Sequence, residues 1–343
     1  MVQAPDRFDR MSKRVLLAAR KRFFMRNKLI FLIILVLLIP AALAESVKNE
    51  PILPLTADHD LDPGLVALGD LLFHDKRLSQ DNSLSCASCH MLSTGGTDKQ
   101  PRSIGVGGAV GGIKAPTVFN SSNNFTQFWD GRAETLEEQA AGPVHNPIEM
   151  NSSWSEVVAK LNDDPELVER FETLFEDGLT GDNIALAIAA FERSMVTLNS
   201  RFDRWLLGEG DALSEAELKG YRLFKSYGCI SCHQGVNVGG NMYGYMGAMG
   251  DYFKDRGTEI TSADLGRYNV THLEQDKHYF KVPSLRLAAI NSPYFHDGTA
   301  KTLDEAVRIM GRYQLGREIP DDEIGQIVAF LHSLVGENVR FKP

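Results

Sequence analysis

Cysteine, long hydrophobic runs and alternating strand patterns are all scarce in this sequence. The 343 residues include four cysteines, all within two short motifs, so a framework of disulfide bonds is not expected. The longest continuous apolar run, residues 29–39, is shorter than the roughly 20 residues that span a membrane comfortably. Because alternation of apolar and polar residues is rare, we expect a mainly α-helical protein with long loops.

Each pair of cysteines is followed directly by a histidine. The motifs read Cys86-Ala87-Ser88-Cys89-His90 and Cys229-Ile230-Ser231-Cys232-His233. This pattern attaches c-type haem: two thiols bond to the porphyrin edge, and the histidine reaches the iron. We therefore expect two covalently bound haems, with His90 and His233 as iron ligands. A zinc site or a thioredoxin-like thiol pair is the alternative, and the repeated histidine argues against both.

The first 44 residues have the pattern of a secretory signal. Residues 1–28 carry nine Lys or Arg and two acidic residues, and the apolar run follows them. Pro40 and the small-x-small sequence Ala42-Leu43-Ala44 then provide a cleavage site. We expect the rest of the chain to be exported to the periplasm. An uncleaved membrane anchor is the alternative.

The exported part of the chain is strongly acidic. Without residues 1–44, 27 basic and 43 acidic residues remain, a net charge of −16. This balance argues against nucleic-acid binding, which needs a basic surface. It favours a positively charged partner such as a small basic electron carrier, although solubility alone would also explain it.

Four capping boxes and the two haem motifs indicate the organisation of the chain. Each half contains one haem motif, although the halves share no close repeat outside these motifs. We therefore expect two cytochrome c-like modules, residues 45–198 and 199–343. Their joint is expected within residues 199–210. Glycine-rich stretches at 105–112 and 239–250 are expected to be loops. The capping boxes are Thr135–Glu138, Ser153–Glu156, Ser214–Glu217 and Thr302–Glu305.

Further motifs resemble those of the bacterial dihaem cytochrome c peroxidase family. With the haem motifs they span nearly the whole exported chain. The resemblance implies an exported enzyme that reduces hydrogen peroxide to water with electrons from a small cytochrome c or a cupredoxin. The motifs are Leu68-Gly69 through Arg77-Leu78-Ser79, Phe128-Trp129-Asp130-Gly131-Arg132-Ala133, Gly142 through Met150, and Pro293-Tyr294-Phe295-His296-Asp297-Gly298, with Met310 beyond them.

The resemblance also assigns roles near the first haem. His90 would hold the peroxide-reducing haem, Glu149 would be the distal acid-base carboxylate, and Gln139 would be the amide that accompanies it. A carboxylate can move a proton between the two peroxide oxygens as general base and then general acid. Glu149 lies between Ile148 and Met150, so we expect an apolar setting that raises its pKa.

The other assigned residues concern electron transfer. Trp129 would lie between the two haems, and His233 with Met310 would be the axial ligands of the second iron. A methionine ligand raises the potential of its iron. His296 would be a structural histidine beside the interface of the two modules.

This chain departs from the family at two places. Residues 91–116 contain no histidine, whereas many members have one there that caps the peroxide-reducing iron. We therefore expect an iron that needs no reductive activation, with His145 as a weak candidate for a substitute ligand. Lys114 stands where the family has a calcium-binding Asn, and a lysine repels a cation. Asn291 and Pro293 remain as oxygen donors, and we expect an interface without calcium.

Two other functions stay open. The related methylamine-utilisation dihaem oxidase modifies tryptophans of a partner protein and has a tyrosine where Met310 stands. Tyr294 and Tyr313 lie nearby in sequence, so Met310 could be misassigned. A dihaem electron carrier without substrate chemistry is the third reading. Family members often form homodimers, and the sequence leaves the oligomeric state open.

Overall fold

The computed structural model describes residues 50–57 and 60–341. The chain divides into two units, residues 1–50 and 51–343, and the description below concerns the second. The expected signal sequence at residues 1–44 lies outside the described residues. Among the helices of the described ranges, none has the length and apolarity needed to cross a membrane.

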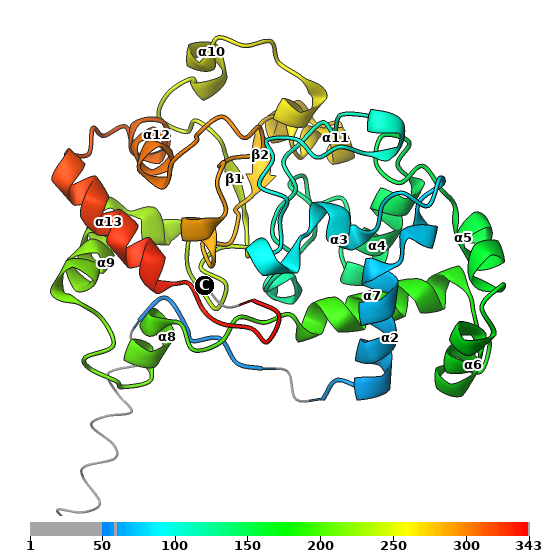
Figure 1. Cartoon of the computed structure of the whole chain (residues 1–343). Coiled ribbons are helices and arrows are strands. Elements are labelled where there is room, and N and C mark those ends of the chain that lie inside the picture. The colour runs from blue at the N-terminus through cyan, green and yellow to red at the C-terminus, as the bar shows by residue number, and fades with distance from the viewer. Residues whose placement is uncertain (1–49, 58–59, 342–343) are drawn as a thin grey trace, which may run out of the picture. The chain divides into compact units, whose positions relative to one another are not determined.

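The described chain is mainly α-helical, as the scarcity of strand patterns predicts (Figure 1). One antiparallel two-stranded sheet pairs β1 (Tyr243–Tyr245) with β2 (Tyr279–Lys281), and Tyr243 lies opposite Lys281. The α-helices are α2 (Pro63–His74), α3 (Cys86–Cys89), α4 (Leu136–His145), α5 (Trp154–Leu161), α6 (Pro165–Leu174), α7 (Gly181–Ser194), α8 (Arg201–Leu206), α9 (Glu215–Tyr227), α10 (Tyr252–Arg256), α11 (Tyr268–Thr271), α12 (Leu303–Leu315) and α13 (Asp321–Ser333). Short 3₁₀ turns η1 (Lys76–Leu78), η2 (Leu92–Thr94), η3 (Val106–Gly108), η4 (Ser121–Asn123), η5 (Cys229–Ser231), η6 (Ser262–Leu265), η7 (Glu274–Asp276) and η8 (Ala288–Ile290) lie in the loops.

The four predicted helix starts are confirmed. At α4, α5, α9 and α12 the capping hydroxyl accepts a hydrogen bond from the N–H three residues later. Only Ser214 and Glu217 complete the reciprocal box, with the Ser214 N–H donating to Glu217 at 2.8 Å. The carboxylates of Glu138 and Glu305 instead accept from the residue before the cap. At these two helices the motif predicts the helix start correctly, but the glutamate accepts its hydrogen bond from the residue before the cap and not from the cap itself.

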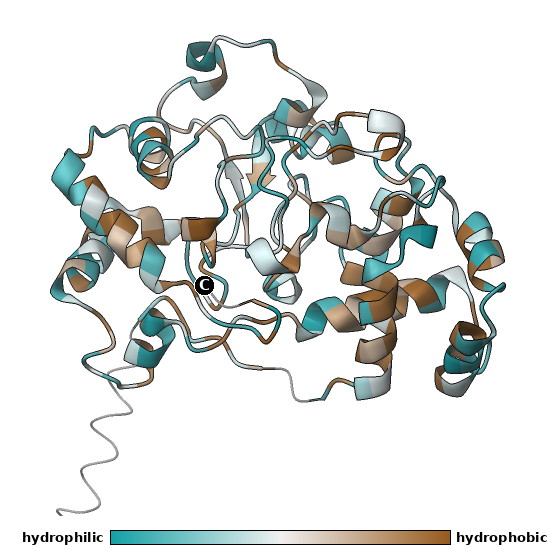
Figure 2. Ribbon diagram, viewed as in Figure 1, coloured by the Kyte–Doolittle hydropathy of each residue, from teal (hydrophilic) through white to brown (hydrophobic). Residues whose placement is uncertain are grey.

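Helices α2 and α7 cross closely at Gly69. A side chain at Gly69 would lie 1.9 Å from the Ala187 carbonyl oxygen, so only glycine permits this approach. One turn later, the rings of Phe73 and Phe191 pack with centroids 5.2 Å apart. Figure 2 shows hydrophobic residues concentrated where these helices meet. This crossing is the centre of the first hydrophobic core.

The same arrangement recurs where α9 meets α13. A side chain at Gly220 would lie 1.8 Å from the Gln326 carbonyl oxygen, and the rings of Phe224 and Phe330 lie 5.1 Å apart. Both crossings therefore use a glycine followed four residues later by phenylalanine. The two halves do share a repeat outside the haem motifs, and it is hidden because so few positions define it.

Each end of the described chain packs into the core that is formed mainly by the other half of the sequence. Most members of the first lie at residues 68–195 and of the second at 202–334, but Ile52 belongs to the second core and Phe341 to the first. The expected joint at residues 199–210 contains helix α8, in which Phe202 is fully buried. The division into modules 45–198 and 199–343 stays a proposal, with a packed helix at its boundary.

Candidate functional site

The first C-x-x-C-H motif is one turn of helix, α3. The His90 N–H donates to the Cys86 carbonyl oxygen at 2.9 Å, which places the imidazole directly after the turn. Its Nδ1 lies 3.3 Å from the Gly96 carbonyl oxygen, so Nε2 is the ring atom that can bind a metal. Burial lowers the pKa of His90 and keeps the ring in the neutral form that ligates metals.

The second motif repeats this geometry at η5. The His233 N–H donates to the Cys229 carbonyl oxygen at 3.0 Å, and the ring Nδ1 lies 3.4 Å from the Val238 carbonyl oxygen. Burial lowers the pKa of His233 to about 4. Both imidazoles are therefore oriented by backbone carbonyls and stay neutral.

The environment of the thiols fits covalent haem attachment better than the two alternatives. Burial raises the pKa of Cys86 to about 12 and that of Cys229 to about 11, whereas a redox-active thiol needs a lowered pKa. In the part of the chain that the structure describes, the cysteines belong to no group of three or more metal-binding side chains. The donors thus fit a haem at each motif, and a bound haem would supply the redox-active iron.

Glu149 is a half-buried carboxyl in the turn that follows α4. Its N–H donates to the Asn146 carbonyl oxygen at 3.0 Å, and the Asn146 side-chain amide donates to Glu149 Oε1 at 2.7 Å. Burial raises the pKa of Glu149, as its apolar neighbours predict, although Asn146 and the charge of Arg132 oppose the shift. The site therefore holds a carboxyl that can exchange a proton closer to neutral pH than an exposed glutamate.

The Glu149 carboxyl lies within electrostatic range of the first haem motif. Burial is the main cause that raises the pKa of Cys89, and the negative charge of Glu149 adds to it. The glycine-rich loop is fixed here as well, because the Val106 N–H donates to the Glu149 carbonyl oxygen at 2.8 Å. Haem motif, carboxyl and loop therefore form one site.

Helix α4 carries two other residues singled out from the sequence. Gln139 is half-buried, and no hydrogen bond joins it to Glu149 within residues 60–341. His145 ends the helix, is exposed, and lies edge-on against Trp154 with ring centroids 5.5 Å apart. This contact directs His145 toward Trp154.

Trp129 links several parts of the site. Its indole N–H donates to the Lys114 carbonyl oxygen at 2.9 Å, and its carbonyl oxygen accepts from the Lys281 N–H at 2.8 Å. The indole lies edge-on to His296, with centroids 6.3 Å apart. Two contacts therefore orient the ring, and a third holds the backbone of Trp129.

Met310 lies on α12 in a third apolar cluster, which includes Phe253 and Phe280. His233, its expected partner at the second iron, packs against Phe224 with ring centroids 6.4 Å apart. No hydrogen bond connects Met310 with His233 in the described chain.

The region expected to replace a calcium site contains a buried ammonium group. Lys114 is 5% exposed, and its Nζ lies 3.3 Å from both Thr97 Oγ1 and the Ala115 carbonyl oxygen. Burial lowers the pKa of Lys114 to about 8. Asn291 donates to the Gly95 carbonyl oxygen at 3.1 Å, while its own Oδ1 is buried without a hydrogen-bond partner among the described residues. A single free amide oxygen is far fewer than the six to eight oxygen ligands that calcium prefers.

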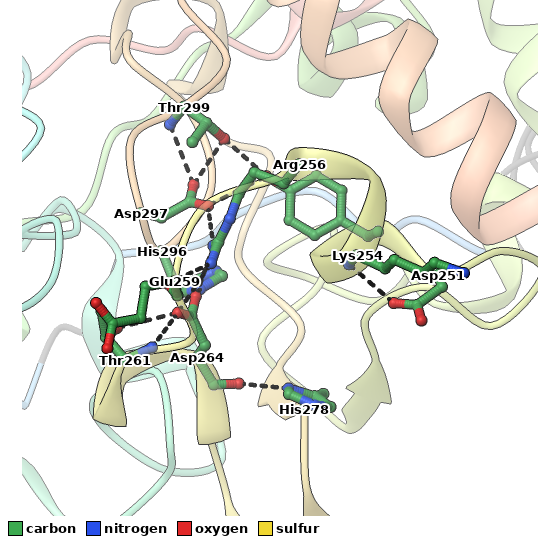
Figure 3. Close-up of polar contacts among 11 residues, drawn as sticks. Asp251, Lys254, Arg256, Glu259, Thr261, Asp264, His278, His296, Asp297 and Thr299 are labelled. Carbon is green, nitrogen blue, oxygen red and sulfur yellow. Dashed lines mark hydrogen bonds and ion pairs between the residues drawn. The ribbon is translucent and has the colours of Figure 1, made fainter.

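His296 belongs to a buried ion-pair network (Figure 3). Its Nε2 lies 2.8 Å from Asp264 Oδ1, and its ring stacks on Phe280. Arg256 Nη1 donates to Asp264 at 2.7 Å and to Asp297 at 2.8 Å. Asp264, His296 and Asp297 could together ligate a metal by distance alone, but the guanidinium already neutralises both carboxylates. The network instead fixes the imidazole that lies against Trp129.

The sequence indicated no role for two residues of the site, Asn146 and Arg132. Asn146 holds the Glu149 carboxylate, and Arg132 places a positive charge near it. The Arg132 guanidinium lies 3.4 Å above the Phe128 ring and pairs with Asp130 at 3.0 Å. The spacing of Asn146, three residues before Glu149 across a proline turn, is the sequence signal that could have identified it.

Comparisons with known proteins identify the family of this chain. Residues 63–211 match the family model described as di-haem cytochrome c peroxidase. The chain is 51% identical to the cytochrome c peroxidase Ccp of Escherichia coli over 290 residues, which are 84% of this chain and 62% of that protein. It is 49% identical to the cytochrome c551 peroxidase of Nitrosomonas europaea, covering 86% of each chain.

More distant similarities extend to MauG and its structural relatives. The methylamine utilization protein MauG of Methylorubrum extorquens is 33% identical over 87% of this chain and 85% of its own. A crystal structure of a MauG-like protein associated with microbial copper homeostasis superposes with a TM-score of 0.74 at 28% identity, covering 86% of this chain and 96% of that one. The chain therefore belongs to the di-haem cytochrome c peroxidase family of oxidoreductases.

Proposed function

We propose that this protein reduces hydrogen peroxide to water at a haem bound by the first motif, with electrons supplied through a haem bound by the second. The observation that carries the proposal is Glu149, a half-buried carboxyl of raised pKa that Asn146 holds within electrostatic range of Cys89. Conversion of one peroxide to two waters consumes two protons and two electrons. A site for this reaction needs a group that both accepts and returns a proton, and Glu149 has that chemistry.

The residues around Glu149 take complementary roles in this proposal. Glu149 accepts a proton from the peroxide oxygen nearer the first haem and returns it to the departing oxygen. Gln139 orients the peroxide by hydrogen bonding. Asn146 keeps the carboxylate in place through its 2.7 Å hydrogen bond.

Electrons would enter through the second motif. His233 and Met310 would ligate its iron, and a thioether ligand favours the high potential that an electron acceptor needs. Trp129 would lie between the two haems, where Lys114 and His296 orient its indole and Lys281 holds its backbone. The acidic exported chain favours a small basic cytochrome c or a cupredoxin as donor.

The proposal also includes the cellular location of the protein and the roles of its two modules. Residues 1–44 would export the chain to the periplasm or anchor it there. Residues 45–198 would carry the peroxide-reducing haem and 199–343 the electron-transfer haem, each attached through two thioethers.

The first prediction is that the oxidised protein is active without prior reduction. Residues 91–116 contain no histidine, and His145 lies against Trp154, so neither this loop nor His145 is expected to cap the first iron. Electron paramagnetic resonance of the fully oxidised protein should lack a low-spin bis-histidine signal from the first haem. Such a signal, with a lag before turnover, would contradict the prediction.

Steady-state consumption of hydrogen peroxide with a reduced small cytochrome c tests the function itself. A peroxidase oxidises two cytochromes for each peroxide consumed. A dihaem electron carrier would exchange electrons with the cytochrome and leave the peroxide unchanged, which would refute the proposal.

The tryptophan-modifying oxidase remains the alternative enzyme. Its relationship is visible in the 33% identity to MauG. Met310 favours the peroxidase, whereas ligation by Tyr294 would favour the oxidase. Burial raises the pKa of Tyr294 to about 12, which opposes the phenolate form that an iron ligand would take.

The second prediction concerns calcium. Because Lys114 places a buried ammonium group where a cation would bind, elemental analysis of the purified protein should find no stoichiometric calcium. Lys114→Asn should create a site whose occupancy rises with added calcium, and Lys99→Asn, at an exposed position, should not. One tightly held calcium per wild-type chain would contradict this prediction.

A further inference from the structure

Lys281 is a largely buried lysine whose ammonium group pairs with none of the described residues. It ends strand β2 and is 8% exposed. In the described part of the chain, no hydrogen bond or ion pair involves its ammonium group. Burial alone shifts its pKa, to about 8, with no contribution from any charged residue. A buried ammonium group without a compensating anion is costly.

The other buried cations of the described chain all have hydrogen-bond partners. Arg286 forms a bidentate pair with Asp203, and Arg256 pairs with Asp264 and Asp297. Even Lys114 has two oxygen acceptors at 3.3 Å. Lys281 differs from all of them, which suggests that its partner is a group that the polypeptide does not supply.

The backbone around Lys281 joins Trp129 to the second haem motif. The Lys281 N–H donates to the Trp129 carbonyl oxygen at 2.8 Å. Two residues later, the Pro283 carbonyl lies close enough to the His233 ring to affect its pKa. Along the strand, successive side chains point to opposite faces. Phe280 stacks on His296, so Lys281 faces away from the ion-pair network and its carboxylates.

We propose that the Lys281 ammonium group binds a propionate carboxylate of the haem at the second motif. This inference rests on the haem binding proposed above. Thioether attachment consumes the vinyl groups of a haem and leaves its two propionates as anions. A propionate would pair with the ammonium group and remove the cost of burying it. The pair would also offset the negative charge near the iron and thereby favour the ferrous state.

Lys281→Met tests the proposal because it keeps the apolar stem and removes the charge. The readouts are haem content per chain and the midpoint potential of each haem between pH 6 and 9, both independent of turnover. Loss of the cation leaves the propionate unpaired. The ratio of ferrous to ferric second haem at a given potential should therefore fall about tenfold, which lowers its midpoint potential by about 59 mV for one electron. The potential should also become pH-dependent, since the freed propionate takes up a proton on reduction.

Two matched variants separate charge from structure. Lys281→Arg should keep a potential close to that of the wild type. Lys277→Met removes a lysine that pairs at the surface with Glu274 and should leave both potentials unchanged. An unchanged second-haem potential in a two-haem Lys281→Met protein would overturn the proposal, as would a shift confined to the first haem or an equal shift in Lys277→Met.

A crystal structure of the wild-type protein with both haems keeps the test decisive if Lys281→Met fails to fold. Lys281 Nζ should lie within hydrogen-bonding distance of a propionate oxygen of the second haem, and contact with water only would refute the pairing. A protein that binds two haems but does not turn over peroxide would refute the peroxidase function and leave this test intact.

Discussion

Glu149→Gln is expected to lower peroxide turnover by about 10²- to 10⁴-fold, the usual contribution of a positioned acid-base group. Glutamine keeps Oε1 as an acceptor for Asn146, so the turn after α4 should survive. Steady-state kinetics with a reduced cytochrome measure the effect, and haem content should stay at two per chain. A variant that retains full turnover would exclude Glu149 as the proton carrier.

The pH profile gives this prediction a second readout. The ionised carboxylate is the base, and burial raises its pKa, so wild-type activity should fall as the pH drops through a value above that of an exposed glutamate. The variant should lose this acidic limb. Glu156→Gln, at an exposed position on α5, is the matched control and should change neither the rate nor the profile.

Arg286→Met is expected to lower the free energy of unfolding by about 3–5 kcal/mol, the cost of leaving one partner of a buried ion pair uncompensated. Arg286 is 1% exposed and holds Asp203 through two hydrogen bonds of 2.8 and 2.9 Å. It also donates to the carbonyl oxygens of Val236 and Leu53. The side chain therefore joins the N-terminal segment, α8 and the loop after the second haem motif.

Denaturant titration of the two-haem protein, followed by circular dichroism, measures this effect. Arg308→Met removes an exposed pair with Asp321 and should cost less than about 1 kcal/mol. Because Asp203→Asn removes the stranded charge, adding it to Arg286→Met should recover part of the loss. Equal costs for Arg286→Met and Arg308→Met would show that burial does not govern this pair.

Local features of the structure follow from the sequence because they depend on neighbours along the chain. The capping residues start their helices at the predicted positions, since each hydroxyl needs only an N–H three residues away. The C-x-x-C-H spacing puts two thiols and an imidazole on one turn. The direction of the Glu149 pKa shift was also predicted, although burial by the fold causes it and the neighbouring Ile148 is 41% exposed.

The environment of charged groups could not be predicted in the same way. Nothing in the spacing of Arg286 and Asp203, or of Arg256 and Asp264, indicates that they pair. The role of Asn146 was missed because many amides precede a glutamate in loops. The absence of a partner for Lys281 is visible only when all surrounding residues are in place.

By itself, the sequence determined the helical class, the helix starts, the two haem motifs and, through its resemblance to known peroxidases, the family. Those properties depend on residue type at short, fixed spacings. The tertiary structure alone decided the two helix crossings at Gly69 and Gly220. It also placed Ile52 in the second core and Phe341 in the first. It also decided which buried charges are compensated, because such contacts join residues far apart along the chain, where spacing carries no information.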